Sequence, residues 1–174
     1  MNNMENLVTL EVAKEDELSQ FKKDLQESFA VTVIEEFGSI DGGPIPSEEE
    51  IEENFNAPGA CVYHILSKGE RVGGVVVSID EETQHNSLDL LFITKGKGCK
   101  GIGYKAWKAI EEMYPETKVW ETHTPAFEKR NIHFYVNKCG FKIVEYLSEK
   151  YNKPHGDEEL PGGEDFFRFE KVMK

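Results

Sequence analysis

The sequence has few cysteines, no long apolar run and a shortage of positive charge. Its three cysteines, Cys61, Cys99 and Cys139, are widely spaced and form no CxxC pair, so neither a disulfide framework nor a metal site is expected. No apolar run approaches the roughly 18 residues that a membrane-spanning helix needs. The first residues lack the basic and apolar regions of a secretory signal, so we expect a cytoplasmic protein with no membrane partner.

Acidic residues outnumber basic ones by 33 to 20, which gives a net charge of −13. A field of this sign repels phosphate backbones, so nucleic acid is not expected as a partner. It suits a cationic partner such as an amine. The chain has 174 residues, of which 39% are apolar and 30% charged, and we expect one globular domain over residues 1–174.

The periodicity of the apolar residues predicts seven strands and four helices. The strands are expected at 7–12, 61–66, 71–79, 88–93, 118–122, 141–146 and 166–172. The helices are expected from 18 to about 29, from a Ser47–Glu50 capping box to about 54, over 102–113, and from Thr124–Pro125 to Gly140. Residues 38–46 and 149–164 are predicted to be loops. The order β-α-α-β-β-β-α-β-α-β-β indicates an α+β (mixed α/β) domain with a mostly antiparallel sheet.

A glycine-rich turn separates the strand at 88–93 from the helix at 102–113. It reads Gly98-Cys99-Lys100-Gly101-Ile102-Gly103 and is locally basic. Backbone N–H groups in such a turn, aided by the dipole of the following helix, can bind phosphate. A Walker A motif would need Gly-Lys-Ser/Thr at its end, and a Rossmann fingerprint would need repeated βαβ units; both are missing. The simpler alternative is a glycine-rich surface turn.

The turn and the segment Asn131–Phe141 together resemble the two sequence blocks of the GNAT family of N-acetyltransferases. Gly98 stands where the family usually has Gln or Arg. The resemblance implies the GNAT acyl-CoA N-acyltransferase fold, with helices flanking a twisted sheet, and acetyl-CoA as cosubstrate without a metal. It implies that the turn and the start of its helix hold the coenzyme pyrophosphate, while the strand holds the pantetheine arm. The residues concerned are Leu91, Phe92, Ile93, Gly98, Cys99, Lys100, Gly101, Ile102, Gly103 and Tyr104.

The second block contains Tyr135, followed by Gly140-Phe141. The resemblance implies that Tyr135 is a catalytic general acid for the leaving thiolate, and a phenol of pKa about 10 suits that task. Asn131 and Phe134 are expected to contact the coenzyme. The alternative for Tyr135 is packing in the core beside Phe134.

An amine acceptor must also lose a proton, and a carboxylate can accept it. Glu121 is the first candidate for this catalytic base, and the alternative is a solvated surface charge. Weaker candidates are Glu35, Glu36, His123 and His155.

The sequence therefore predicts an N-acetyltransferase in which a primary amine of a small molecule or peptide attacks acetyl-CoA directly. A homodimer is a further expectation from the resemblance. Two alternatives stay open: a non-catalytic module of the same fold that senses acyl-CoA or an amino acid, and a ribosomal or protein N-terminal acetyltransferase.

Overall fold

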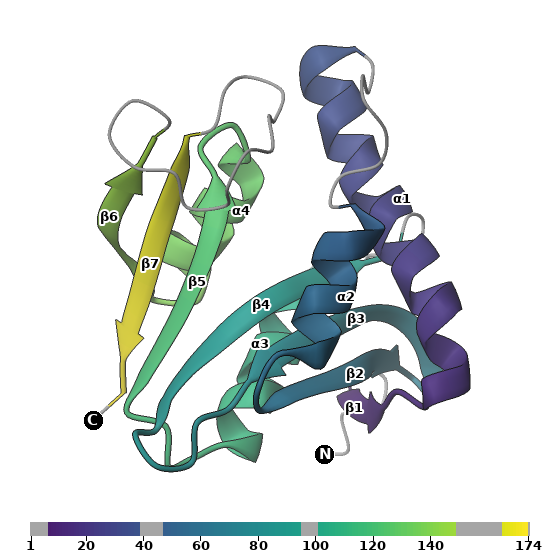
Figure 1. Ribbon diagram of the computed structural model, residues 1–174, viewed down its shortest axis with the longest axis horizontal. Coiled ribbons are helices and arrows are strands. Elements are labelled where there is room, and N and C mark those ends of the chain that lie inside the picture. Colours follow the sequence, from purple (N-terminus) through teal and green to yellow (C-terminus); the bar gives the residue numbers. More distant parts are fainter. Residues whose placement is uncertain (1–6, 39–46, 95–100, 149–164, 174) are drawn as a thin grey trace.

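A computed structural model describes residues 7–38, 47–94, 101–148 and 165–173 (Figure 1). The strands are β1 (Val8–Val12), β2 (Ala60–Ser67), β3 (Glu70–Ser78), β4 (His85–Ile93), β5 (Val119–Pro125), β6 (Lys142–Leu147) and β7 (Phe166–Val172). The helices are α1 (Leu18–Phe37), α2 (Glu48–Asn56), α3 (Ile102–Met113) and α4 (Lys129–His133), with a short 3-10 turn η2 (Glu15–Glu17) and a π-helical turn η3 (Phe134–Lys138). The predicted order of strands and helices is confirmed. Residues 39–46 and 149–164 of the two predicted loops, and Gly98, Cys99 and Lys100 of the glycine turn, lie outside the described residues.

The seven strands form one sheet in the order β1-β2-β3-β4-β5-β7-β6. Every neighbouring pair is antiparallel except β4 and β5, which run parallel. These two strands pair over only three residues each, from His85 and Val119 onward. Beyond that pairing they diverge, so the sheet opens into two wings joined at one end (Figure 1). The Thr122 hydroxyl donates a hydrogen bond to the Leu88 carbonyl oxygen at 2.8 Å where the fork begins.

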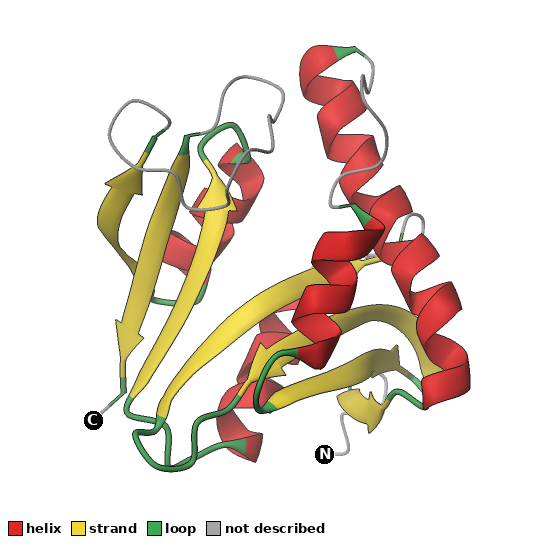
Figure 2. Ribbon diagram, viewed as in Figure 1, coloured by secondary structure: helices red, strands yellow, loops and turns green. Residues whose placement is uncertain are grey.

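Helices cover both faces of the sheet (Figure 2). On one face, α1 and α2 bury Phe21, Leu25 and Ile51 against Val76 and Phe92. On the other face, a larger apolar cluster joins α3, the helical segment 129–138 and the inner strands. Adjacent residues of β3 face opposite ways, as expected of a central strand: Val76 belongs to the first cluster, whereas its neighbours belong to the second.

Two glycines in β3 let its neighbours approach closely. A Cβ atom on Gly73 would lie 2.1 Å from the Phe92 carbonyl oxygen, and one on Gly74 would lie 2.3 Å from the Phe21 ring. Both distances are far below a van der Waals contact. The glycines therefore allow α1 and the end of β4 to pack directly against β3.

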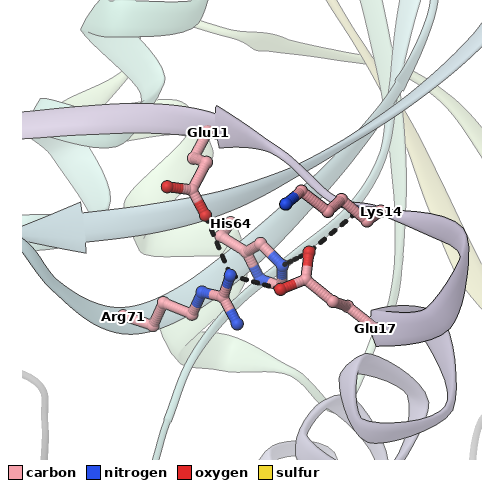
Figure 3. Close-up of polar contacts among 5 residues, drawn as sticks. All are labelled: Glu11, Lys14, Glu17, His64 and Arg71. Atoms are coloured by element: carbon pink, nitrogen blue, oxygen red, sulfur yellow. Dashed lines mark hydrogen bonds and ion pairs between the residues drawn. The ribbon is translucent and has the colours of Figure 1, made fainter.

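A cluster of charged side chains fixes the start of α1 to the sheet (Figure 3). Arg71 of β3 pairs with Glu17 of η2 and, at 2.9 Å, with Glu11 of β1. Glu17 also faces the buried His64 of β2 at 3.3 Å and accepts a hydrogen bond from the Lys14 backbone N–H at 2.9 Å. The hydrogen bonds from Lys14 and Arg71 lower the pKa of Glu17 to about 2. The Glu17 carboxylate thus joins β2 and β3 to the start of α1, and Arg71 extends the cluster to Glu11 of β1.

The helix predicted to begin at Thr124–Pro125 does not begin there. Both residues belong to β5 and pair with Phe167 and Phe166 of β7, and the helix starts at Lys129. Proline has no N–H to donate to the hydrogen-bond ladder, so it is tolerated at the end of a strand. The Ser47–Glu50 capping box is confirmed, since the Ser47 hydroxyl accepts a hydrogen bond from the Glu50 N–H at 3.2 Å.

Candidate active site

Two cavities meet at the fork between β4 and β5. The first, which we call the fork cavity, has a volume of about 320 Å³. Its walls come from α1, α2, β4, β5 and the start of α4, and they include Asp89, Leu91, Glu121, Glu128, Asn131 and Tyr135. The fork cavity forms because the two strands separate while the helices still span the gap.

The second cavity, which we call the strand-edge groove, has a volume of about 350 Å³. It follows the end of β4 toward the start of α3 and is lined by Ser28, Leu91, Phe92, Ile93, Gly103, Arg130 and Phe134, among others. The two cavities share Phe29, Leu91, Glu128 and Asn131 as lining residues. They therefore adjoin, and one molecule can extend from one into the other.

A larger hollow of about 840 Å³ lies beside the paired ends of β4 and β5 and shares Ser87 and Glu121 with the fork cavity. Tyr135 and the residues of the strand-edge groove do not line it. We therefore place the candidate site at the fork, where most of the residues singled out from the sequence meet.

The structure brings together eight of those residues. Leu91, Phe92, Ile93, Gly103, Asn131 and Phe134 line the strand-edge groove, and Glu121 and Tyr135 line the fork cavity. Two others lie elsewhere: the Ile102 side chain is buried in the core, and Tyr104 is 41% exposed and does not line the groove. Ile102 can therefore serve a ligand only through its backbone N–H.

The first turn of α3 begins next to the strand-edge groove. Gly101 is its N-cap and has a φ of +89°, a left-handed conformation that glycine adopts without strain. A Cβ atom on Gly103 would lie 3.4 Å from the Phe134 ring, which is an ordinary van der Waals contact, so α3 starts beside Phe134. The first turn carries no acidic residue. The N–H groups in the first turn of a helix have no partner within the helix, so together with the helix dipole they favour an anion at this end of the groove.

Tyr135 reaches the fork cavity from a π-helical turn. The Cys139 N–H donates to the Phe134 carbonyl oxygen at 2.9 Å, five residues back, which widens the helix by one residue. The Tyr135 ring packs against Phe134, Phe141 and Phe169, with ring centres 5.5 to 5.7 Å apart, and is 6% exposed. Burial raises the pKa of the phenol, while a hydrogen bond with Thr122 acts in the opposite direction. Tyr135 is therefore protonated at neutral pH.

Asp89 is a site residue that the sequence reasoning missed. The register between β3 and β4 shifts there: Val76 pairs with Leu90 and Val77 pairs with Leu88, which leaves Asp89 as an extra, bulged residue. The bulge inverts the alternation of β4, so that Leu88 and Leu90 face opposite sides of the sheet. The alternating pattern alone would have placed them on the same side.

The Asp89 carboxylate lies in the fork cavity between two serine hydroxyls. Ser78 donates to its Oδ2 at 2.5 Å, and Ser87 donates to its Oδ1 at 2.7 Å. Burial raises the pKa of Asp89, the two hydrogen bonds lower it, and the nearby negative charge of Glu121 raises it further. The net effect is a raised pKa, which makes Asp89 a stronger base than an ordinary aspartate.

Glu121, the base predicted from the sequence, lies in the fork cavity but is bound to a cation. Arg168 of β7 contacts its Oε1 at 3.0 Å and also pairs with Glu145 and Glu170. Among the weaker candidates, His123 lines the fork cavity, whereas Glu35 pairs with Arg130 at 3.3 Å. The Glu36 side chain and His155 lie outside what the structure describes.

The fork cavity is acidic. The described residues that line it include the four carboxylates Glu50, Asp89, Glu121 and Glu128, and neither Lys nor Arg is among them. Glu128 is also buried, with 6% of its surface exposed. A positively charged guest is therefore favoured there.

A model of the family described as "Acetyltransferase (GNAT) family" matches residues 21–141. The chain belongs to the GNAT acetyltransferase family. The matched segment runs from the start of α1 to the end of the Tyr135 helix, so it includes the whole lining of the strand-edge groove and all of the fork cavity's lining except Phe166. It also contains the fork of the sheet, where the two wings of this acetyltransferase separate.

Known relatives agree with this family. A protein of Bacillus subtilis (strain 168), described as "Uncharacterized protein YrkN", is 56% identical over 96% of this chain and 94% of its own length. A solved Bacillus subtilis acetyltransferase in complex with CoA is 16% identical with a TM-score of 0.70, covering 97% of this chain and 100% of that one. A spermidine N-acetyltransferase from Vibrio cholerae in complex with CoA and spermine is 14% identical with a TM-score of 0.67, covering 95% of each chain. At these identities the two solved structures establish the GNAT fold.

Within the described residues, no group of three His, Cys, Asp or Glu side chains is arranged to hold a metal ion. No helix in the described ranges is long and apolar enough to cross a membrane.

Proposed function

We propose that this GNAT protein transfers the acetyl group of acetyl-CoA to a primary amine of a cationic small molecule or peptide. The observation that carries the proposal is the pair of adjoining cavities at the fork. One is a groove along a strand edge that ends at a helix N-terminus, and the other is an acidic cavity that contains Tyr135. A two-substrate reaction needs two sites of different character that meet at one point.

The strand-edge groove suits the coenzyme. The edge of β4 that faces β5 is paired with β5 only from His85 to Ser87, so beyond Ser87 this edge can offer backbone groups to the amides of the pantetheine arm. At its end the Ile93 carbonyl oxygen accepts a hydrogen bond from the Ser28 hydroxyl at 3.2 Å. Asn131 and Phe134 close the groove from the other wing. The start of α3, with Gly101 and Gly103, supplies N–H groups for the pyrophosphate.

The fork cavity suits the acceptor. Its carboxylates stabilise an ammonium ion and, once the amine is bound, Asp89 accepts the proton that the amine must lose. The neutral amine then attacks the thioester carbonyl carbon to give a tetrahedral intermediate. A backbone N–H of β4 near Phe92 and Ile93 stabilises the negative charge that develops on the carbonyl oxygen. When the intermediate collapses, its C–S bond breaks.

Tyr135 donates its proton to the thiolate that leaves. Its raised pKa keeps the proton on the phenol at neutral pH, so the proton is available as negative charge develops on the sulfur of the breaking C–S bond. The acetylated nitrogen still carries one extra proton, which passes to the Tyr135 phenolate and restores the phenol. The products are the N-acetylated amine and CoA, and the protein returns to its starting state when Asp89 releases its proton to solvent.

Glu121 is the alternative candidate for the catalytic base. It lies in the same cavity, but its carboxylate is engaged in an ion pair with Arg168. We therefore assign proton acceptance to Asp89, and to Glu121 the negative charge that raises the pKa of Asp89.

The test is a panel of amines incubated with acetyl-CoA and the purified protein, with free CoA and acetylated product measured together. The panel holds polyamines, amino acids, aminoglycosides, basic peptides, and neutral amines of matched size. Equal amounts of CoA and acetylated product from a cationic amine support the proposal. Tight binding of acetyl-CoA without turnover across the panel would instead favour the sensing module.

A further inference from the structure

An ion pair crosses the mouth of the strand-edge groove. Arg130 of α4 lies 3.3 Å from Glu35 of α1, and these helices belong to opposite sides of the fork. Both side chains are well exposed, Arg130 at 80% and Glu35 at 52%. The pair is therefore a contact between the two halves of the groove that solvent reaches freely.

Arg130 also lines the groove itself. Among the described residues of its walls it is the only Lys or Arg, and Gly103 in the first turn of α3 lines the same cavity. A guanidinium group and a helix N-terminus thus border one space of about 350 Å³. Both attract anions, so the space that they border favours a phosphate.

The pair with Glu35 is weak enough to be exchanged. Exposed ion pairs contribute little to stability because water competes for both charges. An arginine binds a phosphate more strongly than a single carboxylate contact, since the planar guanidinium can donate two parallel hydrogen bonds to a dianionic group. The exposed carboxylate that is left behind is solvated at little cost.

We infer that Arg130 exchanges Glu35 for a phosphate of the coenzyme, and that Glu35 is a built-in competitor that lowers coenzyme affinity. The inference rests on the proposed binding of acetyl-CoA in the strand-edge groove. It adds a residue outside the glycine turn to the phosphate site. The ion pair between Arg130 and Glu35 would then break when the coenzyme binds and form again when CoA leaves.

The experiment measures dissociation constants by calorimetry for the wild type, Glu35→Gln, Arg130→Gln and the double variant. Each is titrated with acetyl-CoA, with 3′-dephospho-CoA and with S-acetylpantetheine, which contains no phosphate. The matched controls are Glu27→Gln on the same helix and Lys129→Gln beside Arg130, because neither residue lines the groove. Glu27→Gln removes one negative charge, as Glu35→Gln does, and Lys129→Gln removes one positive charge, as Arg130→Gln does.

We expect Glu35→Gln to bind acetyl-CoA about two- to five-fold more tightly, as suits removal of an exposed ion pair. Arg130→Gln should bind about ten-fold more weakly, and Glu35→Gln should have no effect in that background. S-acetylpantetheine should not distinguish the variants. A Glu35→Gln effect that persists with 3′-dephospho-CoA assigns Arg130 to the pyrophosphate, and one that disappears assigns it to the 3′-phosphate.

Three results would overturn the inference while leaving the proposed function intact: unchanged affinity in Glu35→Gln, unchanged affinity in Arg130→Gln, or tighter binding of S-acetylpantetheine by Glu35→Gln. The failure of the proposed function itself looks different. In that case neither the wild type nor any variant binds acetyl-CoA.

Discussion

At the scale of single residues, Tyr135 and Asp89 show how burial prepares two groups for opposite tasks. Tyr135 is surrounded by three aromatic rings, and burial keeps its proton on the phenol. Asp89 is buried between two serines, and burial raises its pKa so that it takes a proton more readily. Both line one cavity, so a proton donor and a proton acceptor face the same guest.

Tyr135→Phe should lower kcat by roughly 10²- to 10⁴-fold, the usual effect of losing a general acid, and should leave acetyl-CoA binding unchanged. The reason is that only the phenolic proton is removed, while the ring still fills its place in the core. Steady-state kinetics and calorimetry on one preparation check this. Tyr104→Phe, on the exposed side of α3, is the control and should behave as wild type.

Asp89→Asn should lower kcat/KM by roughly 10²- to 10⁴-fold at neutral pH. In the wild type the rate should rise with pH as Asp89 loses its proton, and this rise should lie above the ordinary carboxyl value of 3.8 because the pKa of Asp89 is raised. The asparagine variant should lack the rise.

Glu121→Gln separates the two assignments of the base. Without the negative charge of Glu121 the pKa of Asp89 should fall, so the rise in the pH profile should move to lower pH with much of the activity retained. If Glu121→Gln is instead as inactive as Asp89→Asn is expected to be, Glu121 is the base.

At the scale of elements, the sequence predicted the order of strands and helices because each has a clear period or cap. Ser47 and Glu50, for example, form the predicted capping box. The helix start predicted at Thr124–Pro125 was wrong. A Thr-Pro pair is typical of a helix start, but pairing with β7 holds these residues in a strand. Tertiary contacts decided that segment.

The site was less predictable than the fold, and Asp89 shows why. The side of the sheet that Asp89 faces depends on a bulge in β4. The bulge arises from pairing with β3, and no local sequence pattern indicates it. The ion pair between Glu121 and Arg168 joins residues 47 positions apart, so no local pattern could reveal that the predicted base has a cation beside it. The motif residues Asn131, Phe134 and Tyr135 all line the two cavities, because one helical segment carries them.

Gly73→Ala tests the close approach of β3 and β4. The new methyl group would meet the Phe92 carbonyl oxygen at 2.1 Å, so the backbone must shift, and we expect a loss of about 1–3 kcal/mol in the free energy of unfolding. Urea denaturation measures it. Gly103→Ala should leave stability unchanged within about 0.5 kcal/mol, since its Cβ atom meets only the Phe134 ring at 3.4 Å. Equal stability of Gly73→Ala and wild type would refute the account of this contact.

Glu17 tests the charged cluster of Figure 3. Its pKa is about 2 in the folded protein against an ordinary value of 4.5, so the carboxylate stabilises the fold above pH 4.5 and loses that effect as the pH falls toward 2. Glu17→Gln should therefore be less stable than wild type at neutral pH, and the difference should shrink on acidification. Chemical denaturation at a series of pH values checks this, with Glu15→Gln in the same turn as the control.

At the scale of the whole molecule, the net charge of −13 and the acidic fork cavity both attract a cationic acceptor. Long-range attraction raises the rate of encounter, and salt screens it. We expect kcat/KM for a cationic amine to fall several-fold between low and near-physiological ionic strength, while a neutral amine of similar size shows little change. An equal response of both amines would contradict the charge argument.

The two wings and their single fork explain why one sheet can serve two substrates. A sheet paired along its whole width would leave no free strand edge for the pantetheine arm and no cavity beside it. The predicted homodimer and the cytoplasmic location stay predictions. Light scattering across a concentration series tests the first, and the location of a tagged chain in cell fractions tests the second.

The most direct test of the central claim is isothermal titration of the protein with acetyl-CoA, beside desulfo-CoA and ATP. We predict micromolar binding of acetyl-CoA and of desulfo-CoA, since the groove holds the nucleotide and the pantetheine arm, and much weaker binding of ATP, which lacks that arm. Failure of acetyl-CoA to bind, or equal binding of ATP, would contradict the assignment of the strand-edge groove to the coenzyme and with it the proposed acetyl transfer.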